Sequence, residues 1–514
     1  MRHMKKEGSF QEKALIVLAI ALVLRLIIAG LSHVSGDACW HISVGKFIAR
    51  TGHIPLYEPL GRPVFWSPPL FNWFIAFFFK VGSWFSPLFA SGGIMLISVL
   101  FGLGTLIYTY KLAKEVANEK AAFLAVVFLS FLPIHIYLSA IPYNDTMISF
   151  FAIAAVYHAI RRQYIIASIL TGLGLLTKYT GFFILPVIIL IALINESKKI
   201  RAIERSVMMT VISLAIGLPW YLRNQILLGN PLWPKLTRIF GDKTGFVETV
   251  FPSTRLSFEN LFHGKHLVRT YLELFGVPAG HVRNLYFLKI PFIDVLIALW
   301  LLGTFIYLFP AIIGLFKTKW YKKKNLYLVM VLLSFSVFFF VSILFNDLTL
   351  TRYLLPALPV LAIVWASGFE SMPKPWKVWY VGLFVILIIG FSGIEIVKAK
   401  IVEHAWGQYD NDFAWIGENT PQNAIFLSQG DNCYAYNFDR LTEQYNGVYD
   451  IDTIFRARAR NITYVYVNQK WTLTGDYDGN PLLYDKDFLE ELDHYATKVY
   501  DNQETGSMVY QLKK

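Results

Sequence analysis

Long apolar runs separated by short polar segments dominate the first four-fifths of the chain. Ala14 to Val34 is apolar apart from Arg25 and His33, and at about 1.5 Å per residue it can cross a hydrocarbon core of roughly 30 Å. Similar runs follow, and the hydropathy and loop-charge rules together predict about eleven transmembrane helices. They lie near residues 14–34, 92–112, 121–141, 146–160, 164–177, 179–195, 206–222, 292–316, 326–345, 353–370 and 376–397.

Lysines and arginines gather in alternate short segments between these runs, which predicts the orientation of the helices. Basic loops are typical of the cytoplasmic side, and Arg2, Lys5 and Lys6 place the N-terminus there. The first run is too long for a signal-peptide core and no small-residue cleavage site follows it, so we expect an uncleaved anchor. Residues 35–91, 141–146, 223–291, 346–352 and everything after 398 are then expected outside the cytoplasm.

The long outer segments and the C-terminal region have patterns of their own. Residues 35–91 and 223–291 combine prolines with aromatic stretches, which indicates interfacial helices; packing on the bundle as plain loops is the alternative. After residue 397 the sequence predicts strands near 424–428, 462–467 and 507–512 and helices near 451–460 and 485–496. We therefore predict a transmembrane domain over 1–397 and a small extracytoplasmic soluble α/β domain over 398–514.

Composition supports the membrane class and excludes others. Hydrophobic residues make up 55% and charged residues 16% of the 514 positions, with a mean hydropathy of +0.47, which excludes a soluble protein of this length. The net charge of +12 comes from the cytoplasmic loops, so no nucleic-acid partner is expected. The cysteines are Cys39 and Cys433, both on the predicted outer side. A disulfide between them is an alternative, but no spacing supports it, so we expect them to be unpaired.

Two outer turns each present one carboxylate among loops poor in acids. Asp37 follows the first apolar run, close to Trp40 and His41, and Asp145 stands in the turn after the third run. Each aspartate could simply cap a helix. A pair of carboxylates is also what a general base with a divalent-cation site requires, so Asp37 and Asp145 are candidate catalytic residues and candidate ligands of a cation such as Mg, Mn or Zn.

Three cations accompany these carboxylates at outer boundaries, against the usual charge distribution of membrane proteins. Lys178 stands beside Tyr179 between two short apolar runs, Arg223 ends one run and Arg352 stands beside Tyr353. Snorkelling of long side chains to the interface is the simple explanation. Because three such cations lie on the side of both carboxylates, the sequence also favours binding of a phosphate.

These pieces together resemble the GT-C superfamily of integral-membrane glycosyltransferases, in the branch of the protein O-mannosyltransferases and aminoarabinose transferases that use polyprenyl-phosphate (dolichyl-phosphate) sugars. The resemblance covers most of residues 14–370. The matching segments are Gly36-Asp37 with Trp40-His41, Trp66 to Leu70, Asn144-Asp145, Gly172 to Gly181, Pro219 to Asn224 with Gly229 to Leu232, and Arg352 to Pro359.

The resemblance implies a role for each site residue. It makes Asp37 the catalytic carboxylate of the first outer loop and Asp145 a second active-site carboxylate. The substrate would be held by His41, Lys178, Tyr179, Arg223, Arg352 and Tyr353. Many relatives carry Asp-Glu where this chain has Asp37-Ala38, and bacterial members often carry a lysine at the position of Ser67. The Trp-Trp-Asp signature of oligosaccharyltransferases is absent.

From this resemblance we expect a multi-pass enzyme of the cell membrane that transfers a hexosyl, mannosyl or pentosyl group. The donor would be a sugar on a polyprenyl phosphate and the acceptor a hydroxyl of a protein, lipid or glycan, with inversion at the anomeric carbon. Asp37 would act as general base. A lipid or solute transporter or flippase is the alternative class, although no inverted repeats with interrupted helices are seen, and a non-catalytic scaffold is a third.

Overall fold

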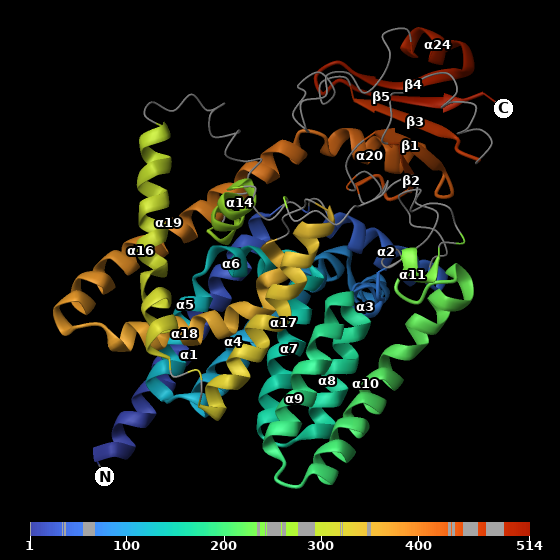
Figure 1. Cartoon of the computed structure of the whole chain (residues 1–514). Coiled ribbons are helices and arrows are strands. Elements are labelled where there is room, and N and C mark those ends of the chain that lie inside the picture. Colours follow the sequence, from blue (N-terminus) through green and yellow to red (C-terminus); the bar gives the residue numbers. More distant parts are fainter. Residues whose placement is uncertain are drawn as a thin grey trace. The chain divides into compact units, whose positions relative to one another are not determined.

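The computed structural model places most of the chain in two compact units (Figure 1). It describes residues 2–32, 34, 37–54, 67–233, 237–241, 243, 259, 264–275, 293–318, 320, 322–346, 351–429, 433, 437–445, 461–468 and 488–513. Unit 1 comprises Met1–Leu31, Trp66–Phe71 and Gly92–Lys398. Unit 2 comprises Ser32–Phe65, Asn72–Ser91 and Ala399–Lys514, so the C-terminal region shares a unit with most of the first predicted outer segment.

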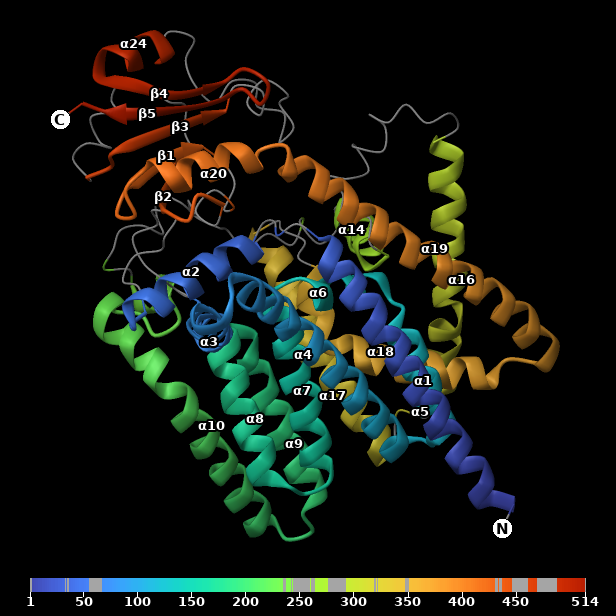
Figure 2. The same cartoon turned by 180° about the vertical axis from the view of Figure 1, so that it is seen from behind.

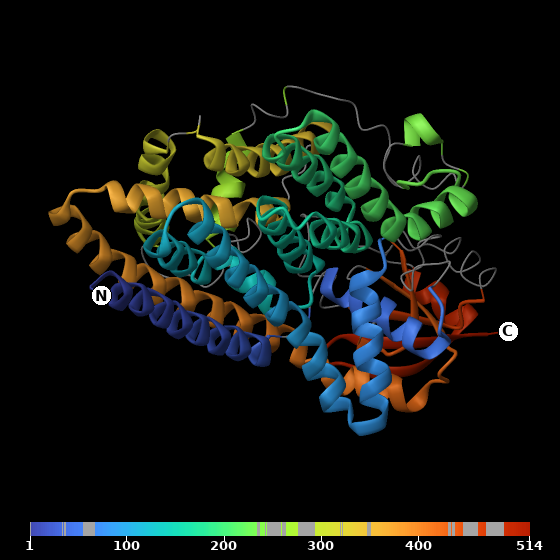
Figure 3. The same ribbon diagram turned by 90° about the horizontal axis from the view of Figure 1, so that it is seen from below.

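Unit 1 is built from helices. They are α1 (Arg2–Leu31), α4 (Pro87–Val116), α5 (Glu119–Ser130), α6 (Pro133–Ala140), α7 (Asn144–Ile160), α8 (Tyr164–Thr177), η1 (Tyr179–Phe183), α9 (Ile184–Asn195), α10 (Lys199–Leu228), α11 (Thr237–Phe240), α14 (Gly264–Leu274), α16 (Ile293–Lys317), α17 (Lys323–Asn346), η2 (Thr351–Ala357), α18 (Leu358–Ser371) and α19 (Lys374–Gly407), where α4 and α19 run on into unit 2. Among them, α7, α8, α9 and α10 lie side by side (Figures 1 and 3).

Five helices of the described residues are long and apolar enough to cross a membrane, or six if one bent pair is a single span. The five segments are Phe10–Leu31, Phe89–Val116, Lys199–Leu228, Thr351–Ser371 and Lys374–Val397. Further apolar helices, including α8, are shorter than 18 residues. The chain is thus an integral membrane protein made largely of helices, while the number of about eleven spans stays a prediction.

The bent pair stands where the sequence predicted a single helix near residues 121–141. Helices α5 and α6 meet at 67°, where Pro133 has no N–H to continue the ladder of α5. Arg25 of α1 is fully buried beside this break and donates to the Ser130 carbonyl at 3.2 Å, to Ser139 Oγ at 2.6 Å and to His135 Nδ1 at 2.8 Å. Arg25, the only charge in the first apolar run, therefore donates hydrogen bonds to polar groups at the break between α5 and α6.

Unit 2 contains the helices α2 (Asp37–Thr51), α3 (Leu70–Phe85), α20 (Asp410–Asn419) and α24 (Phe488–Tyr495) and a five-stranded sheet. The strands β1 (Ile425–Gln429), β2 (Leu441–Tyr445), β3 (Tyr464–Asn468), β4 (Ala496–Asn502) and β5 (Ser507–Leu512) lie in the order β2-β1-β3-β5-β4. The pairs β1–β2 and β1–β3 are parallel, and β3–β5 and β4–β5 are antiparallel. Figure 2 shows α24 and α20 on opposite sides of this sheet.

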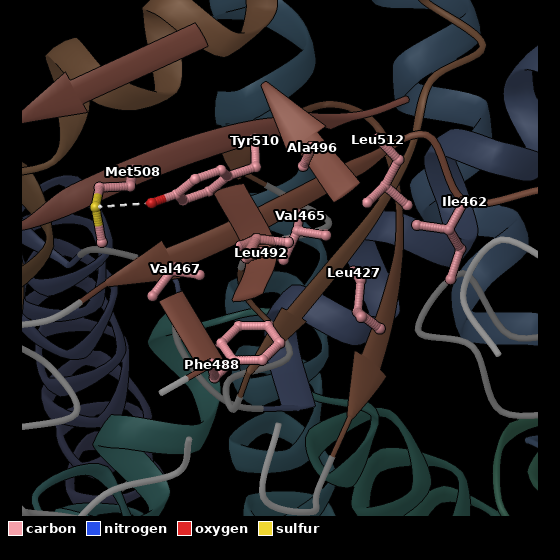
Figure 4. Close-up of a cluster of buried hydrophobic side chains, with 10 residues drawn as sticks. All are labelled: Leu427, Ile462, Val465, Val467, Phe488, Leu492, Ala496, Met508, Tyr510 and Leu512. Atoms are coloured by element: carbon pink, nitrogen blue, oxygen red, sulfur yellow. Dashed lines mark hydrogen bonds between the residues drawn. The ribbon is translucent and has the colours of Figure 1, made fainter. Parts of the chain in front are cut away.

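Alternation along the strands buries both faces of the sheet. Leu427, Val465 and Val467 pack with Phe488 and Leu492 of α24 (Figure 4). On the opposite face, Phe426 and Tyr466 contact Phe438, which also contacts Phe413 of α20. A strand with both faces covered needs apolar residues at nearly every position, which β3 has in Tyr-Val-Tyr-Val.

The predicted α/β region is confirmed with additions. The strands near 424–428, 462–467 and 507–512 appear as β1, β3 and β5, and the helix near 485–496 as α24. The pattern did not reveal β2 and β4, because Leu-Thr-Glu-Gln-Tyr is polar and β4 is an edge strand whose side chains are exposed or half-buried except for Ala496. The helix predicted over 451–460 lies outside the described residues.

The prediction that both cysteines are unpaired is wrong in this structure. Cys39 of α2 and Cys433 form a disulfide across 394 residues, with Cα atoms 4.9 Å apart. Spacing along the chain could not reveal the pair, because only the packing of unit 2 brings the two segments together.

Candidate active site

Asp145 and Lys178 form a buried ion pair in unit 1. The Lys178 Nζ atom donates to Asp145 Oδ1 at 2.5 Å, and the Asp145 side chain is only 2% exposed. Among the described residues, Asp145 Oδ2 has no hydrogen-bond partner although it is buried. The N-cap of α7 is Tyr143 and makes no side-chain cap bond, so helix capping does not explain Asp145. A buried carboxylate needs such a counter-charge.

The local chain direction around Lys178 allows this contact. Lys178 follows the last residue of α8 in an extended conformation, with φ −160° and ψ 149°, and breaks the helix before η1 begins. Its ammonium group also lies over the Tyr353 ring, 5.0 Å from the centroid. The Lys178 side chain is thus held by a carboxylate and by an aromatic ring. Snorkelling to the membrane interface alone does not explain these two contacts.

Helix η2 brings two predicted site residues to the same turn. Arg352 lies over the ring of Tyr143, 5.7 Å from its centroid, and Tyr353 contacts Lys178. Ser149 of α7 donates to the Leu355 carbonyl at 3.2 Å, which joins α7 to η2. Four of the predicted residues, Asp145, Lys178, Arg352 and Tyr353, are therefore assembled around the start of α7.

Tyr179 and Arg223 form a neighbouring group at the end of α10. The Tyr179 hydroxyl donates to the Trp233 carbonyl at 2.6 Å and accepts from Asn224 Nδ2 at 3.4 Å. Arg223 donates to Asn224 Oδ1 at 2.9 Å, and its guanidinium lies 4.8 Å from the centroid of the Trp220 ring. Because Tyr179 directly follows Lys178, this group adjoins the ion pair.

Asp37 and His41 lie in unit 2, at the beginning of α2. Asp37 is the first residue of this helix and half-buried, where the helix dipole favours a negative charge. His41 is buried, and its Nδ1 lies 2.8 Å from Oδ1 of Asn72 in α3. Because the acceptor is an amide oxygen, Nδ1 carries the proton. Asn72 was not anticipated from the sequence, since a lone asparagine in an apolar stretch carries no signal of its partner.

The described donor atoms near Asp145 do not form a site for a divalent cation. No group of three His, Cys, Asp or Glu side chains that could hold a metal occurs in the part of the chain that the structure describes. The ammonium of Lys178 already occupies Asp145 Oδ1, and a cation there would have to lie beside another positive charge. The balancing charge for Asp145 is thus supplied by the chain.

Comparison with known proteins agrees with the architecture. Residues 67–222 match the family described as dolichyl-phosphate-mannose-protein mannosyltransferase. No curated protein matches the chain by sequence. Among solved structures, ArnT from Cupriavidus metallidurans in the apo state aligns with a TM-score of 0.65 at 11% identity, over 97% of each chain.

Two other solved structures have similar architecture. The oligosaccharyltransferase AglB from Archaeoglobus fulgidus aligns over 98% of this chain and 74% of its own, with a TM-score of 0.57 and 14% identity. The arabinofuranosyltransferase AftD from Mycobacteria aligns over 98% of this chain and 40% of its own, with a TM-score of 0.59 and 12% identity. The chain therefore has the GT-C fold, which confirms the fold that the resemblance of its motifs implied.

Proposed function

We propose that this protein is a glycosyltransferase that moves a sugar from a polyprenyl phosphate to an acceptor hydroxyl on the extracytoplasmic side. The observation that carries the proposal is the assembly of Lys178, Arg352 and Tyr353 around buried Asp145. The family match supports it, as do solved relatives that hold a lipid phosphate: ArnT is bound to undecaprenyl phosphate in one structure and AglB to dolichol-phosphate in another.

The reaction is a direct displacement at the anomeric carbon with inversion. The acceptor oxygen forms the new bond to this carbon while the bond to the phosphate oxygen breaks, and its electron pair leaves with the polyprenyl phosphate. The carboxylate of Asp37 takes the proton of the acceptor hydroxyl. General-base catalysis of this kind contributes about 10²–10⁴-fold to the rate.

The cations of unit 1 stabilise the charge that develops on the leaving phosphate. An ammonium has three N–H donors, so Lys178 can keep its bond to Asp145 and still donate to a phosphate oxygen. Arg223 and Arg352 add guanidinium groups, which match phosphate geometry. Tyr179 and His41 complete the proposed substrate contacts. These residues do not distinguish a hexosyl from a pentosyl donor.

Topology belongs to the same proposal. The N-terminus would lie in the cytoplasm, and the soluble region from residue 398 would lie outside with the acceptor, which is a protein, a lipid or a glycan. A lipid-linked donor suits this side because it carries its sugar across the membrane and its tail remains among the helices.

The test is transfer by the purified full-length protein from a radiolabelled polyprenyl-phosphate sugar to candidate acceptors. Asp37→Asn should lower the rate by about 10²–10⁴-fold without changing the melting temperature by more than the control does. The matched control is Asp410→Asn, which removes a first-turn aspartate from α20 and should retain transfer. Substantial transfer by Asp37→Asn would exclude the general-base role.

A transporter would behave differently in the same preparation. It would move the labelled lipid across a vesicle membrane without consuming the sugar linkage, and Asp37→Asn would not alter the chemical state of the donor. Release of free polyprenyl phosphate together with a labelled acceptor excludes that class.

A further inference from the structure

The helix that begins with Asp37 is held on two faces, and one of them is covered by the C-terminal part of unit 2. On the first face, Gly45 approaches α3 so closely that a Cβ atom there would lie 2.3 Å from Ile75 Cγ2. His41 on the same side bonds Asn72. These contacts join α2 to its neighbour in the chain.

Three residues on another face of α2 bind the C-terminal segment. Cys39, Lys46 and Arg50 are spaced by 7 and 4 positions, which places them on one side of the helix. Cys39 is disulfide-bonded to Cys433. Lys46 Nζ lies 3.0 Å from Asp439 Oδ1, and Arg50 Nη2 lies 2.5 Å from Asp439 Oδ2. One covalent bond and a two-armed ion pair thus hold the helix along its length.

The two residues on either side of Asp439 are anchored in the C-terminal part of unit 2. Arg440 is buried and donates through Nη2 to the carbonyls of Gly417 and Thr420, both at 2.8 Å. Phe438 is fully buried and contacts Phe413 and Phe426. Asp439, which stands between Phe438 and Arg440, therefore projects from a fixed support, and its ion pairs with Lys46 and Arg50 transmit the position of that support to α2.

We propose that Cys433 and Asp439 are positioning residues that place Asp37 through α2, so that transfer depends on the Cys39–Cys433 disulfide being formed. Asp37 stands two residues before Cys39, and a shift of the first turn of α2 would move its carboxylate directly. A general base works only when its oxygen lies within about 3 Å of the oxygen whose proton it takes, and misplacement by about 1 Å can cost about 10²-fold in rate. The inference rests on the proposed function.

The experiment uses the folded full-length protein in lipid, so that refolding is not required. Treatment with a thiol reductant should lower the turnover number by about 10²-fold, with little change in the KM for the labelled donor, and reoxidation should restore it. The Cys39→Ser/Cys433→Ser double variant should behave like the reduced protein and no longer respond to reductant. Asp439→Asn should lower turnover by a smaller factor.

Two controls separate positioning from general stability. Asp501→Asn breaks an ion pair with Lys498 in the same domain and should leave turnover unchanged. In the Asp37→Asn background, reduction should produce no further loss, because the group being positioned is gone. A further loss there of the same size as in the unsubstituted protein would mean that reduction merely unfolds the enzyme, and would overturn the proposal.

Hydrogen exchange over residues 37–51 gives a readout that does not need activity. Exchange should increase on reduction if the disulfide holds α2. Unchanged exchange and unchanged turnover would overturn the inference. If the oxidised protein transfers no sugar at all, the proposed function fails separately, and exchange decides the positioning: faster exchange on reduction supports it and equal exchange overturns it.

Discussion

At the scale of single residues, the most informative pair is Asp145 with Lys178. Sequence patterns placed both at outer turns and assigned the carboxylate to capping or catalysis and the cation to snorkelling or phosphate binding. The structure joins them at 2.5 Å. Each side chain therefore supplies the counter-charge that the other needs in a buried position.

Lys178→Gln should lower both stability and transfer. Without the ammonium, Asp145 is a buried charge with no counter-ion, and breaking such a pair typically costs about 3–5 kcal/mol. Lys178→Arg keeps the charge and should retain most of the stability. Thermal unfolding in detergent and the transfer assay measure the two effects. Equal melting temperatures for both variants would contradict the importance of the pair.

Metal removal is a second prediction at this scale. Because Lys178 supplies the positive charge at Asp145 Oδ1, chelation with excess EDTA should change transfer by less than about twofold, whereas loss of one essential electrostatic partner would cost about 10²–10³-fold. The zinc in one AglB structure belongs to that protein. A large loss on chelation that added Mg, Mn or Zn restores would return the divalent cation to the mechanism.

At the scale of elements, close helix contacts in unit 1 depend on glycine. Helices α16 and α18 cross where Gly368 meets Gly314: a Cβ on Gly368 would lie 1.8 Å from the Pro310 carbonyl oxygen, and one on Gly314 would lie 2.0 Å from that of Val364. Small residues let backbones approach in membranes, where apolar burial alone does not drive association. No hydropathy pattern distinguishes these glycines from others in apolar runs.

Gly368→Ala should destabilise the protein by about 1–3 kcal/mol, since the new methyl group would have to displace the backbone of α16. The control is Gly390→Ala in α19, where a Cβ meets nothing within 4 Å and the helix gains propensity. Comparing their melting temperatures checks the prediction. A lower melting temperature for Gly390→Ala than for Gly368→Ala would refute the packing argument.

At the scale of the whole molecule, the C-terminal region and most of the first predicted outer segment belong to one unit. Burial works against ionisation of Asp439, but Lys46 and Arg50 outweigh it and hold the pKa of this carboxyl below its usual value. The stability that Asp439 contributes is therefore complete above its unfolded pKa of about 3.9 and is lost as the pH falls through the lower folded value.

The difference in melting temperature between the unsubstituted protein and Asp439→Asn should accordingly stay constant from pH 7 to about pH 5 and shrink below about pH 4. The variant cannot titrate at this position, so the difference isolates one group. An increase of the difference in acid would mean that the folded pKa is raised, contrary to the ion pairs described.

The sequence by itself determined the class of the molecule. Runs of about 20 apolar residues form helices in a membrane, because the helix satisfies every backbone N–H and C=O group internally. The basic loops between these runs predict the side of the membrane on which each carboxylate lies. The strands β1, β3 and β5 were also readable, because alternation and β-branched or aromatic residues act locally. The motifs around Asp37, Asp145, Lys178 and Arg352 were sufficient to predict the fold that the solved structures share.

Only the tertiary structure decided which of these residues act together. The ion pair of Asp145 with Lys178 spans 33 positions, the contact of Arg25 with Ser139 spans 114 and the disulfide spans 394. Periodicity and hydropathy indicate whether a segment faces water, lipid or the protein interior. They do not indicate which segments lie close to one another. Charges buried within a unit are paired in the folded state, because the free-energy cost of burying an unpaired charge exceeds the contribution of any local conformational preference.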